Sequence, residues 1–455
     1  MSRSMQVAAA VAAALSVSGV ALAAPPSLSA AASTTNVLYV AGSSAAKSGI
    51  IGALQANLCG GIANALTVSS GNTNTNFFAV SCTVASSSGL SIAGQVATVY
   101  YRDEGGSVVG ALPIVSGQPV EQLNLGAGSA LITCANASTC TANVTGSSAS
   151  NGLNDSFGGA VAKQTVQLGI TDLEPAVFVG AGDNYPSAYS TSVYGTASAS
   201  QMAALSTTSS PLFQQVFALF VNVNSSAFGA TKPTTLNIPK AALTNVLQGF
   251  VGDWSSVTTT SGTAVASSSL PVTIVNRESG SGSRAGASIY FTGDECSPSA
   301  TTIADTAGPS GDFFSTGNVL TQANLVAGSV TYASIDNFNS TTLPNLVMVS
   351  IDGIFPSNIN AANGQYDYWF EATAVPNPKA TGVAATLSSW LIGELQAEAT
   401  APHTDDVNAI PGLSTNNPAL PITSTANTLS SGGPTIYVNQ FTRGGSSCNT
   451  PLDAL

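Results

Sequence analysis

The residues best suited to chemistry in this sequence lie in one short stretch, from Arg277 to Arg284. The chain has only ten Lys and Arg among 455 residues, so two arginines around a Ser and Gly loop stand out. A guanidinium presents a planar fork of donors that fits a tetrahedral oxyanion. The unpaired N–H groups at a helix start also favour anions. The stretch therefore predicts an oxyanion site formed by Arg277 with Ser281, Gly282 and Ser283.

The same residues also have a purely structural interpretation. Ser is a common residue just before a helix, where its hydroxyl caps the first turn. Arg277 would then form an exposed ion pair with Glu278, and Arg284 would face solvent. The sequence favours ligand contact for Arg277 and leaves both interpretations open for Arg284.

Two earlier segments repeat the pattern of an apolar strand, a Gly or Ser loop and a helix. The first, 36–60, has Ser43 and Ser44 in its loop, and the second has Ser107 where its helix would start. A third apolar strand ends at Asp172. Because strand–loop–helix units are the building blocks of α/β folds, an α/β architecture is expected.

The rest of the chain predicts further strands and helices with loops between them. Residues 211–224 predict a helix that runs into an apolar strand. Residues 236–254 have apolar side chains at helical spacing. The segments 134–158 and 181–210 are rich in Ser, Thr and Ala and are interpreted as loops.

Composition restricts the class of protein. Residues 1–23 contain Arg3, an apolar stretch and a final Ala-Leu-Ala, which predicts a cleaved signal peptide and a periplasmic or secreted location. No later segment reaches the roughly 20 apolar residues of a membrane-spanning helix. A net charge of -12 argues against nucleic-acid binding and anionic membranes. The mature length exceeds what one core usually supports, so two lobes are expected.

The six cysteines predict disulfides, because an even number in an exported chain rarely stays reduced. Fifteen pairings are open for six cysteines. Closeness in sequence suggests Cys59 with Cys82 and Cys134 with Cys140, which would leave Cys296 with Cys448. None has the paired spacing of a zinc site, and neither a metal nor a cofactor is predicted.

Motifs for catalysis are weak. The segment 42–48 imitates a nucleotide-binding loop, but Lys47 stands where its second Gly belongs. There is no Gly-x-Ser-x-Gly motif, and the only histidine, His403, lies in a Pro-rich segment. No catalytic residue is therefore predicted.

The order of these segments resembles that of the phosphate-binding proteins of bacterial ABC importers, a family of two-lobed periplasmic binding proteins. The shared segments are "YVAGSSA", "LGITDLEP", "VFALFVNV", "LTNVLQGFVGDWSSV" and "NRESGSGSRAG". The last is similar to the Arg-x-x-Gly-Ser-Gly-Thr motif of the family. The resemblance implies that phosphate is bound by Ser44, Ser107, Asp172, Arg277, Ser281, Gly282 and Ser283.

The resemblance also implies a fold. It is an α/β fold of two periplasmic-binding-protein-like lobes, with mixed sheets flanked by helices and two crossover strands between them. The expected first lobe comprises 35–215 and 345–455, with Ser/Thr-rich insertions, and the second comprises 216–344.

The implied function is binding of inorganic phosphate, or a similar oxyanion, in the cleft between the lobes. The membrane complex of an ABC importer is the expected partner. One alternative is a secreted surface or assembly protein with the same fold and no role in transport. A phosphatase is a weaker alternative, because the chain has a single histidine and no metal cluster in its sequence.

Asp172 leads to a hypothesis about selectivity. An ionised Asp has acceptors and no donor, so it repels a bound dianion unless the ligand brings a proton. Phosphate near neutral pH carries such a proton, whereas sulfate carries none. The alternative is that Asp172 caps a helix beginning at 173–175.

Overall fold

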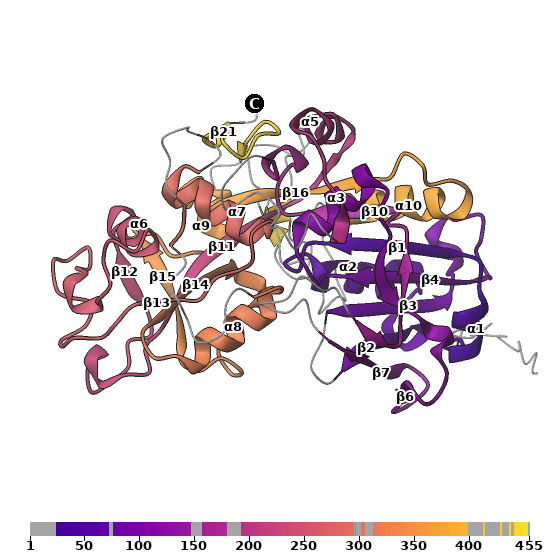
Figure 1. Cartoon of the computed structure of the whole chain (residues 1–455), viewed down its shortest axis with the longest axis horizontal. Coiled ribbons are helices and arrows are strands. Elements are labelled where there is room, and N and C mark those ends of the chain that lie inside the picture. The colour runs from indigo at the N-terminus through magenta and orange to yellow at the C-terminus, as the bar shows by residue number, and fades with distance from the viewer. Residues whose placement is uncertain are drawn as a thin grey trace, which may run out of the picture.

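The computed structural model describes residues 24–71, 76–146, 157–179, 193–294, 296, 302–304, 313–398, 413–414, 428–429, 436–437 and 441–453. The predicted signal peptide and His403 lie outside these residues. The chain forms two α/β lobes, joined by the strands β11 (Ser210–Asn222) and β16 (Trp369–Pro376) (Figure 1). The predicted fold class, two lobes with mixed sheets flanked by helices and two crossover strands, is confirmed.

The first lobe is built on a mixed sheet with the strand order β16-β10-β1-β4-β3-β2-β7-β6. Its strands are β1 (Val37–Gly42), β2 (Leu66–Gly71), β3 (Phe77–Thr83), β4 (Val96–Arg102), β6 (Ile132–Cys134), β7 (Thr139–Thr145) and β10 (Leu168–Thr171). β1 lies between β4 and β10 and is parallel to both, whereas β3 is antiparallel to β4 and β2. The carboxyl ends of three parallel strands therefore lie at one edge of the lobe.

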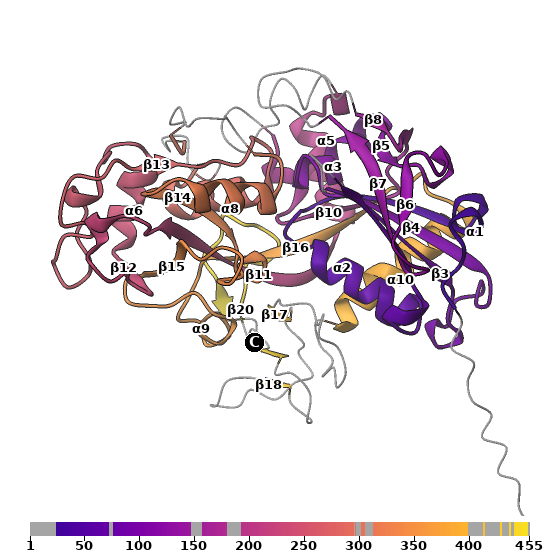
Figure 2. The same cartoon turned by 90° about the horizontal axis from the view of Figure 1, so that it is seen from below.

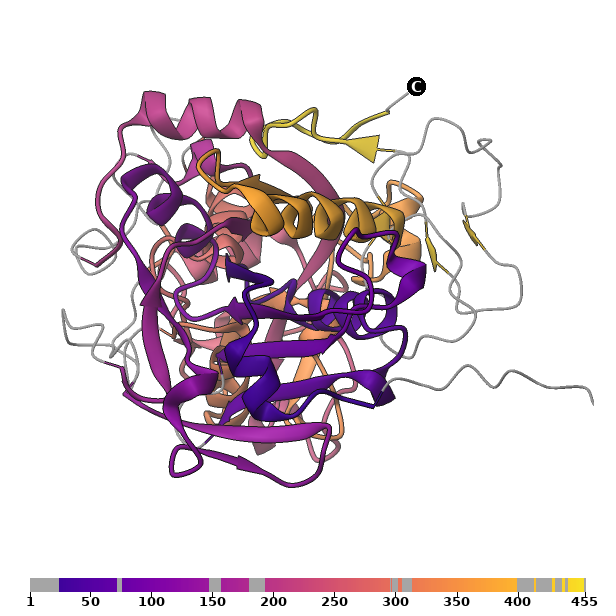
Figure 3. The same ribbon diagram turned by 90° about the vertical axis from the view of Figure 1, so that its right-hand side faces the viewer.

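Helices cover both faces of this sheet because the side chains of β1 alternate between them. Leu38 and Val40 share an apolar cluster with residues of α2 (Lys47–Ala53) and α10 (Gly382–Glu398). Figure 3 shows the long helix α10, in orange, running across this lobe. Ala41 packs toward α3 (Ser107–Ser116). A short helix, α1 (Leu28–Ser33), lies against β4, and α2 continues as the π-helix η1 (Leu54–Leu58).

The second lobe has a smaller mixed sheet in which β14 and β15 flank β11. Its strands besides β11 are β12 (Leu236–Ile238), β13 (Thr273–Ile274), β14 (Ser329–Ser334) and β15 (Leu346–Ile351). Its helices include α6 (Lys240–Leu247), α7 (Gly282–Ala287), α8 (Thr316–Leu325) and α9 (Asn358–Ala362), and α7 continues as the π-helix η8 (Ser288–Thr292). Figure 2 shows α8 beside β14.

One predicted lobe limit differs from the structure. The range 345–455 was expected in the first lobe, but β15 pairs with β11 and with β12, which places it in the second lobe. β15 belongs to the second lobe because both of its neighbours in the sheet, β11 and the edge strand β12, are paired with it there. The other limits stay predictions.

Three local predictions are wrong. The helix expected at the start of 211–224 is part of β11, in which every residue from Leu212 onward is buried. A strand buried on both faces shows no alternation, so its sequence does not distinguish it from a buried helix. The predicted loop 134–158 contains the whole of β7, in which every second residue is buried. The predicted loop 181–210 contains α5 (Ala199–Thr208), which begins with a capping box.

The remaining strands are β5 (Val120–Leu123), β8 (Gly158–Gly159), β9 (Val161–Gln164), β17 (Leu413–Ser414), β18 (Thr428–Leu429), β19 (Ile436–Tyr437), β20 (Phe441–Thr442) and β21 (Leu452–Asp453). Of these, β8 pairs with β7 and β17 with β11, whereas β5 with β9, β18 with β19 and β20 with β21 form separate two-stranded sheets. β20 and β21 pair as a C-terminal hairpin. Among the described residues, no helix has the length and apolar character needed to cross a membrane.

All three predicted disulfides are confirmed. Cys59 is bonded to Cys82, Cys134 to Cys140, and Cys296 to Cys448, with sequence separations of 23, 6 and 152 residues. The first two lie within the first lobe. The third joins the second lobe to the C-terminal hairpin. Three disulfides indicate that the chain folds in an oxidising compartment, as exported proteins do.

Candidate functional site

The predicted ligand residues lie together where the two lobes meet. Three of them follow parallel strands of the first lobe: Ser44 follows β1, Ser107 begins α3 after β4, and Asp172 follows β10. The carboxyl ends of parallel strands are where open α/β sheets usually bind ligands. The sheet therefore brings together residues that are far apart in sequence.

Hydrogen bonds connect the residues of the first lobe. The Ser43 hydroxyl donates to the Asp172 carboxylate, and the Asp172 backbone N–H donates to Ser107 Oγ over 2.9 Å. These side chains are at most 2% exposed. The short 3-10 turn that follows begins at Pro175 with Glu174 before it, so Asp172 is not its N-cap residue.

The second lobe contributes Arg277, whose guanidinium lies in a shell of oxygen acceptors. Its Nη1 donates to Thr316 Oγ1 over 3.0 Å and to Ser283 Oγ over 3.5 Å, and its Nε donates to the Phe313 carbonyl over 3.0 Å. The arginine is 1% exposed, which excludes the interpretation of an exposed ion pair.

Arg284 is also buried, although the sequence left its orientation open. Its Nη1 donates to the Arg277 carbonyl over 2.8 Å, so it supports the backbone that carries Arg277. The hydroxyl of Ser281 caps α7 by accepting from the Arg284 backbone N–H. Capping and a place at the site are therefore compatible for this serine.

The first turn of α7 lies directly against the first lobe. A Cβ atom at Gly282 would be 2.3 Å from Ser107 Oγ and 2.4 Å from Asp172 Oδ2, so no larger residue fits there. The Val108 backbone N–H also donates to the Gly280 carbonyl over 3.0 Å. All seven predicted residues thus belong to one cluster that both lobes form.

The sequence interpretation missed Thr316, the first residue of α8. Its Oγ1 lies 2.8 Å from Ser44 Oγ, and its backbone N–H donates to the same oxygen over 3.1 Å. Thr316 therefore links Ser44 of the first lobe to Arg277 of the second. Its signal was visible, because Ser315, Thr316 and Gly317 form a hydroxyl-rich helix start like the other three.

Asp336 is a second carboxylate that was missed. It lies half-buried in the turn after β14, and Asn337 Nδ2 donates both to its Oδ2 over 3.0 Å and to the Ala45 carbonyl over 3.4 Å. Burial raises the pKa of Asp336 to about 7, and the nearby Asp172 contributes in the same direction. Nothing in the local sequence indicates this shift, because its causes come from distant segments.

Burial and charge have opposite effects on the pKa values of Asp172 and Arg277. Burial raises the pKa of Asp172, while hydrogen bonds from Ser43 and Ser107 and the charge of Arg277 act against this. Burial lowers the pKa of Arg277, and the charges of Glu278 and Asp172 act against that change. The two groups therefore stabilise each other in the charged form.

The cluster has the chemistry of an anion site with proton acceptors beside it. A guanidinium and several hydroxyls are donors to an oxyanion, and two carboxylates are acceptors for protons that the ligand carries. Within the ranges that the structure describes, no group of three or more His, Cys, Asp or Glu side chains is placed to hold a metal ion.

Comparison with known proteins finds likeness in structure and not in sequence. No family model and no curated protein matches the chain. A Clostridium perfringens protein assigned as a phosphate ABC transporter substrate-binding protein, with phosphate bound, is 11% identical, with a TM-score of 0.40, over 83% of this chain and 99% of that one.

Two other solved structures show the same kind of likeness. The periplasmic phosphate-binding protein PfluDING, bound with phosphate, is 15% identical, with a TM-score of 0.36, over 67% of this chain and 89% of its own. A phosphate transport receptor from Vibrio cholerae is 15% identical, with a TM-score of 0.30, over 52% and 79%. The phosphate named for these three structures is the ligand of those proteins.

Proposed function

We propose that this chain is an exported solute-binding protein that holds inorganic phosphate, or an oxyanion of the same shape, between its two lobes. The observation that carries the proposal is the convergence of Arg277, Ser44, Ser107 and Asp172 from three strand ends and the opposite lobe. A buried arginine among hydroxyls suits a tetrahedral oxyanion, and a neighbouring carboxylate suits one that still carries a proton.

Each residue has a distinct part in this proposal. Arg277 neutralises the negative charge of the ligand, and Ser44, Ser107 and Ser283 donate hydroxyl hydrogen bonds. The N–H groups of the loop 281–283 add donors at the start of α7. Asp172 accepts the proton of the phosphate and thereby disfavours sulfate.

Access to the site requires the lobes to separate, because its side chains are buried. Hydrogen bonds cross between the lobes at the site, such as Ser44 to Thr316 and Val108 to Gly280. Bending of β11 and β16 would break them and expose Arg277. The ligand would favour closure to the extent that it binds the closed form more tightly.

Binding rather than catalysis is proposed, with the membrane complex of an ABC importer as the partner that receives the ligand. The cluster offers donors and acceptors, while its arginine is engaged by several oxygens and its serine hydroxyls are bonded to neighbours. A surface or assembly protein with the same fold is the alternative if the cleft binds no oxyanion.

Isothermal titration of the purified protein with phosphate tests the proposal, with sulfate as the competing anion. Ser44→Ala should weaken phosphate binding by roughly 1–3 kcal/mol, because a buried hydroxyl contact is lost. Ser81→Ala is the matched control, since Ser81 is equally buried but bonds only within the first-lobe sheet.

Tight phosphate binding that Ser44→Ala weakens and Ser81→Ala leaves unchanged supports the proposed site. The absence of any heat with phosphate would contradict phosphate binding and favour the surface or assembly protein. Release of phosphate from an ester by the wild-type protein would instead favour a phosphatase.

A further inference from the structure

The C-terminal hairpin, residues 441–453, lies across the junction of the two lobes and contacts both of them. We call it the C-terminal latch. It consists of β20, β21 and the turn between them, in which Cys448 lies. It is separated from α10 by more than 40 residues of sequence, so chain connectivity does not hold it in this place.

The latch is bonded covalently to the second lobe, and a buried arginine holds it at the start of the crossover strand β16. The disulfide to Cys296 lies just after η8, which continues the helix that starts at the anion loop. Arg443 is 6% exposed and stacks on the rings of Trp369 and Phe370. Its guanidinium donates to the Trp369 carbonyl over 2.9 Å and to the Asp367 carbonyl over 2.7 Å.

The latch also contacts the two crossover strands. Gln214 of β11 donates through Nε2 to the Phe441 carbonyl over 2.8 Å. Glu371 of β16 accepts from Thr442 Oγ1 over 2.7 Å and from the Arg443 backbone N–H over 3.3 Å. The latch is thus tied to both strands about which the lobes would bend.

Glu174 fastens the latch to the first lobe. Its Oε1 accepts from the Ser447 backbone N–H over 2.8 Å, and its Oε2 accepts from the Ser447 hydroxyl. Glu174 stands two residues after Asp172, the proposed proton acceptor of the site. The residue next to Ser447 is Cys448, so the two lobes are connected through adjacent latch residues.

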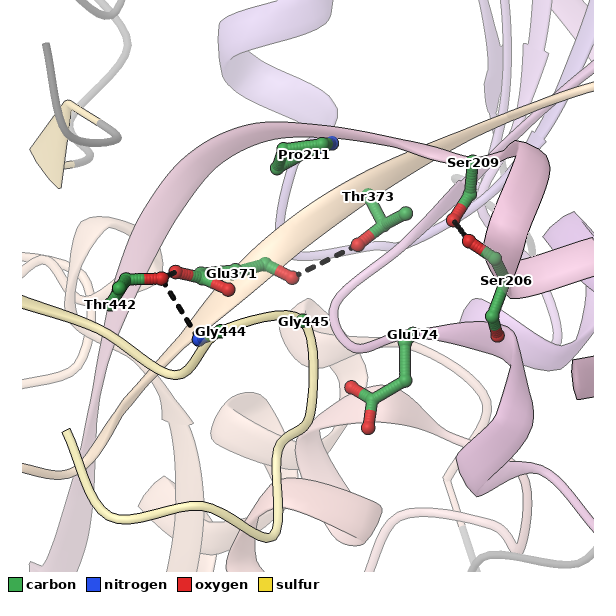
Figure 4. A pocket seen from close by; sticks show the side chains of 9 residues that line it. All are labelled: Glu174, Ser206, Ser209, Pro211, Glu371, Thr373, Thr442, Gly444 and Gly445. Atoms are coloured by element: carbon green, nitrogen blue, oxygen red, sulfur yellow. Dashed lines mark hydrogen bonds between the residues drawn. The ribbon is translucent and has the colours of Figure 1, made fainter. Parts of the chain in front are cut away.

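A cavity lies between part of the latch and the crossover strands. It has a volume of about 370 Å³ and is lined by Glu174, Ser206, Ser209, Pro211, Glu371, Thr373, Thr442, Gly444 and Gly445 (Figure 4). Beside this cavity the latch is bonded to Glu371 through Thr442 and to Glu174 through Ser447. Its attachment here depends on the individual bonds of Glu174 and Glu371.

We propose that the C-terminal latch restrains the separation of the two lobes, with Cys296–Cys448 as its second-lobe fastening and Glu174 as its first-lobe fastening. Because the latch contacts both sides of the junction, opening of the cleft must break the Glu174 bonds or carry the latch along. Release of either fastening increases the population of the open form. The inference holds whatever anion the cleft binds.

Hydrogen exchange of the full-length mature protein without phosphate tests the latch. The amides of Val108 and Thr316 are the reporters, since each donates to an acceptor on the other lobe. Amides in the β3–β4 ladder are internal controls, because they stay paired when the lobes separate. In the double variant Cys296→Ser with Cys448→Ser, the two reporter amides should exchange at least tenfold faster than in the wild type. The exchange rates of the control amides should not change.

A second variant keeps the test decisive if the cysteine variant does not fold. Glu174→Gln keeps the size of the side chain but leaves one acceptor oxygen for the two Ser447 donors, and it should speed exchange of the reporter amides about threefold. Glu394→Gln is its matched control, because Glu394 accepts from Asn57 within the first lobe. Cys134→Ser with Cys140→Ser is the control for the loss of a disulfide.

Reporter amides that exchange at the wild-type rate in the folded latch variants would overturn the proposal. A failure of phosphate binding would leave it untouched, since no ligand enters the measurement. Faster exchange of reporter and ladder amides together would show global unfolding and would also overturn a specific role in lobe separation.

Discussion

The two lobes meet through two sets of contacts that differ in kind. In the cleft, the lobes touch through hydroxyl and backbone hydrogen bonds such as Ser44 to Thr316 and Val108 to Gly280. At the C-terminal latch they are connected by a disulfide, by a buried arginine stacked on aromatic rings, and by carboxylates. Each neutral hydrogen bond contributes only about 0.5–1.5 kcal/mol. The hydrogen bonds between the lobes at the site are therefore individually weak, whereas the latch includes a covalent bond.

The difference indicates that the site and the C-terminal latch have separate roles, since one must open and the other limits opening. A site that must open needs contacts that water or a ligand replaces at little cost. A segment that limits opening needs contacts that cost more to break, such as a disulfide or a buried charge. The following predictions test this division, beginning with the largest expected effect.

Removal of the latch disulfide should destabilise the protein more than removal of the shortest one. The loop-closure model gives about 5 kcal/mol for the 152-residue separation of Cys296 and Cys448, and about 2 kcal/mol for the 6-residue separation of Cys134 and Cys140. Urea unfolding of the two double Ser variants measures both losses. Equal losses would show that the latch contributes no more than a local loop.

Arg277→Ala should weaken phosphate binding by roughly 2–5 kcal/mol, because a buried charge that pairs with the anion is removed. Arg284→Ala should weaken it less, since Arg284 donates to the backbone carbonyl of Arg277 and supports it from behind the site. Titration calorimetry at one salt concentration compares the two variants. Equal affinity of the wild type and Arg277→Ala would move the site elsewhere.

Asp172→Asn should narrow the preference for phosphate over sulfate by roughly 1–3 kcal/mol, with little change in melting temperature. The amide keeps the shape of the carboxylate, loses its charge and gains a donor. Competition between the two anions measures the ratio. An unaltered ratio in a protein that binds phosphate would remove Asp172 from the explanation of selectivity.

Asp336→Asn should flatten the dependence of stability on pH. The folded-state pKa of Asp336 is about 7, above its ordinary value of 3.8. Between these values the folded chain keeps a proton that the unfolded chain has lost, so the free energy of unfolding falls as pH rises toward 7. The variant should be more stable than wild type by roughly 1–2 kcal/mol at pH 8, a figure reduced for partial exposure.

Unfolding titrations of both proteins at pH 5 and pH 8 provide this measurement. The wild type should lose more stability than Asp336→Asn between the two pH values. Equal losses of stability in the two proteins would contradict the prediction. They would show that the pKa of Asp336 in the folded protein is near its ordinary value.

Much of the architecture was predictable because its signals are local. The strand, loop and helix units at Ser44, Ser107 and Ser283 are recognisable in short windows. The disulfide between Cys134 and Cys140 follows from their closeness, and the last pair follows by exclusion once the others are assigned. The scarcity of positive charge made Arg277 conspicuous.

The tertiary structure alone decided the features that depend on distant neighbours. The start of β11 is a strand because β16 pairs with it, although its apolar run has no periodicity that distinguishes strand from helix. Thr316 belongs to the cleft because α8 begins opposite Ser44, 272 residues away. Asp336 has a raised pKa because folding buries it near Asp172. Residue types and their spacing determined the local units, whereas burial and the contacts between lobes arise only when the units pack.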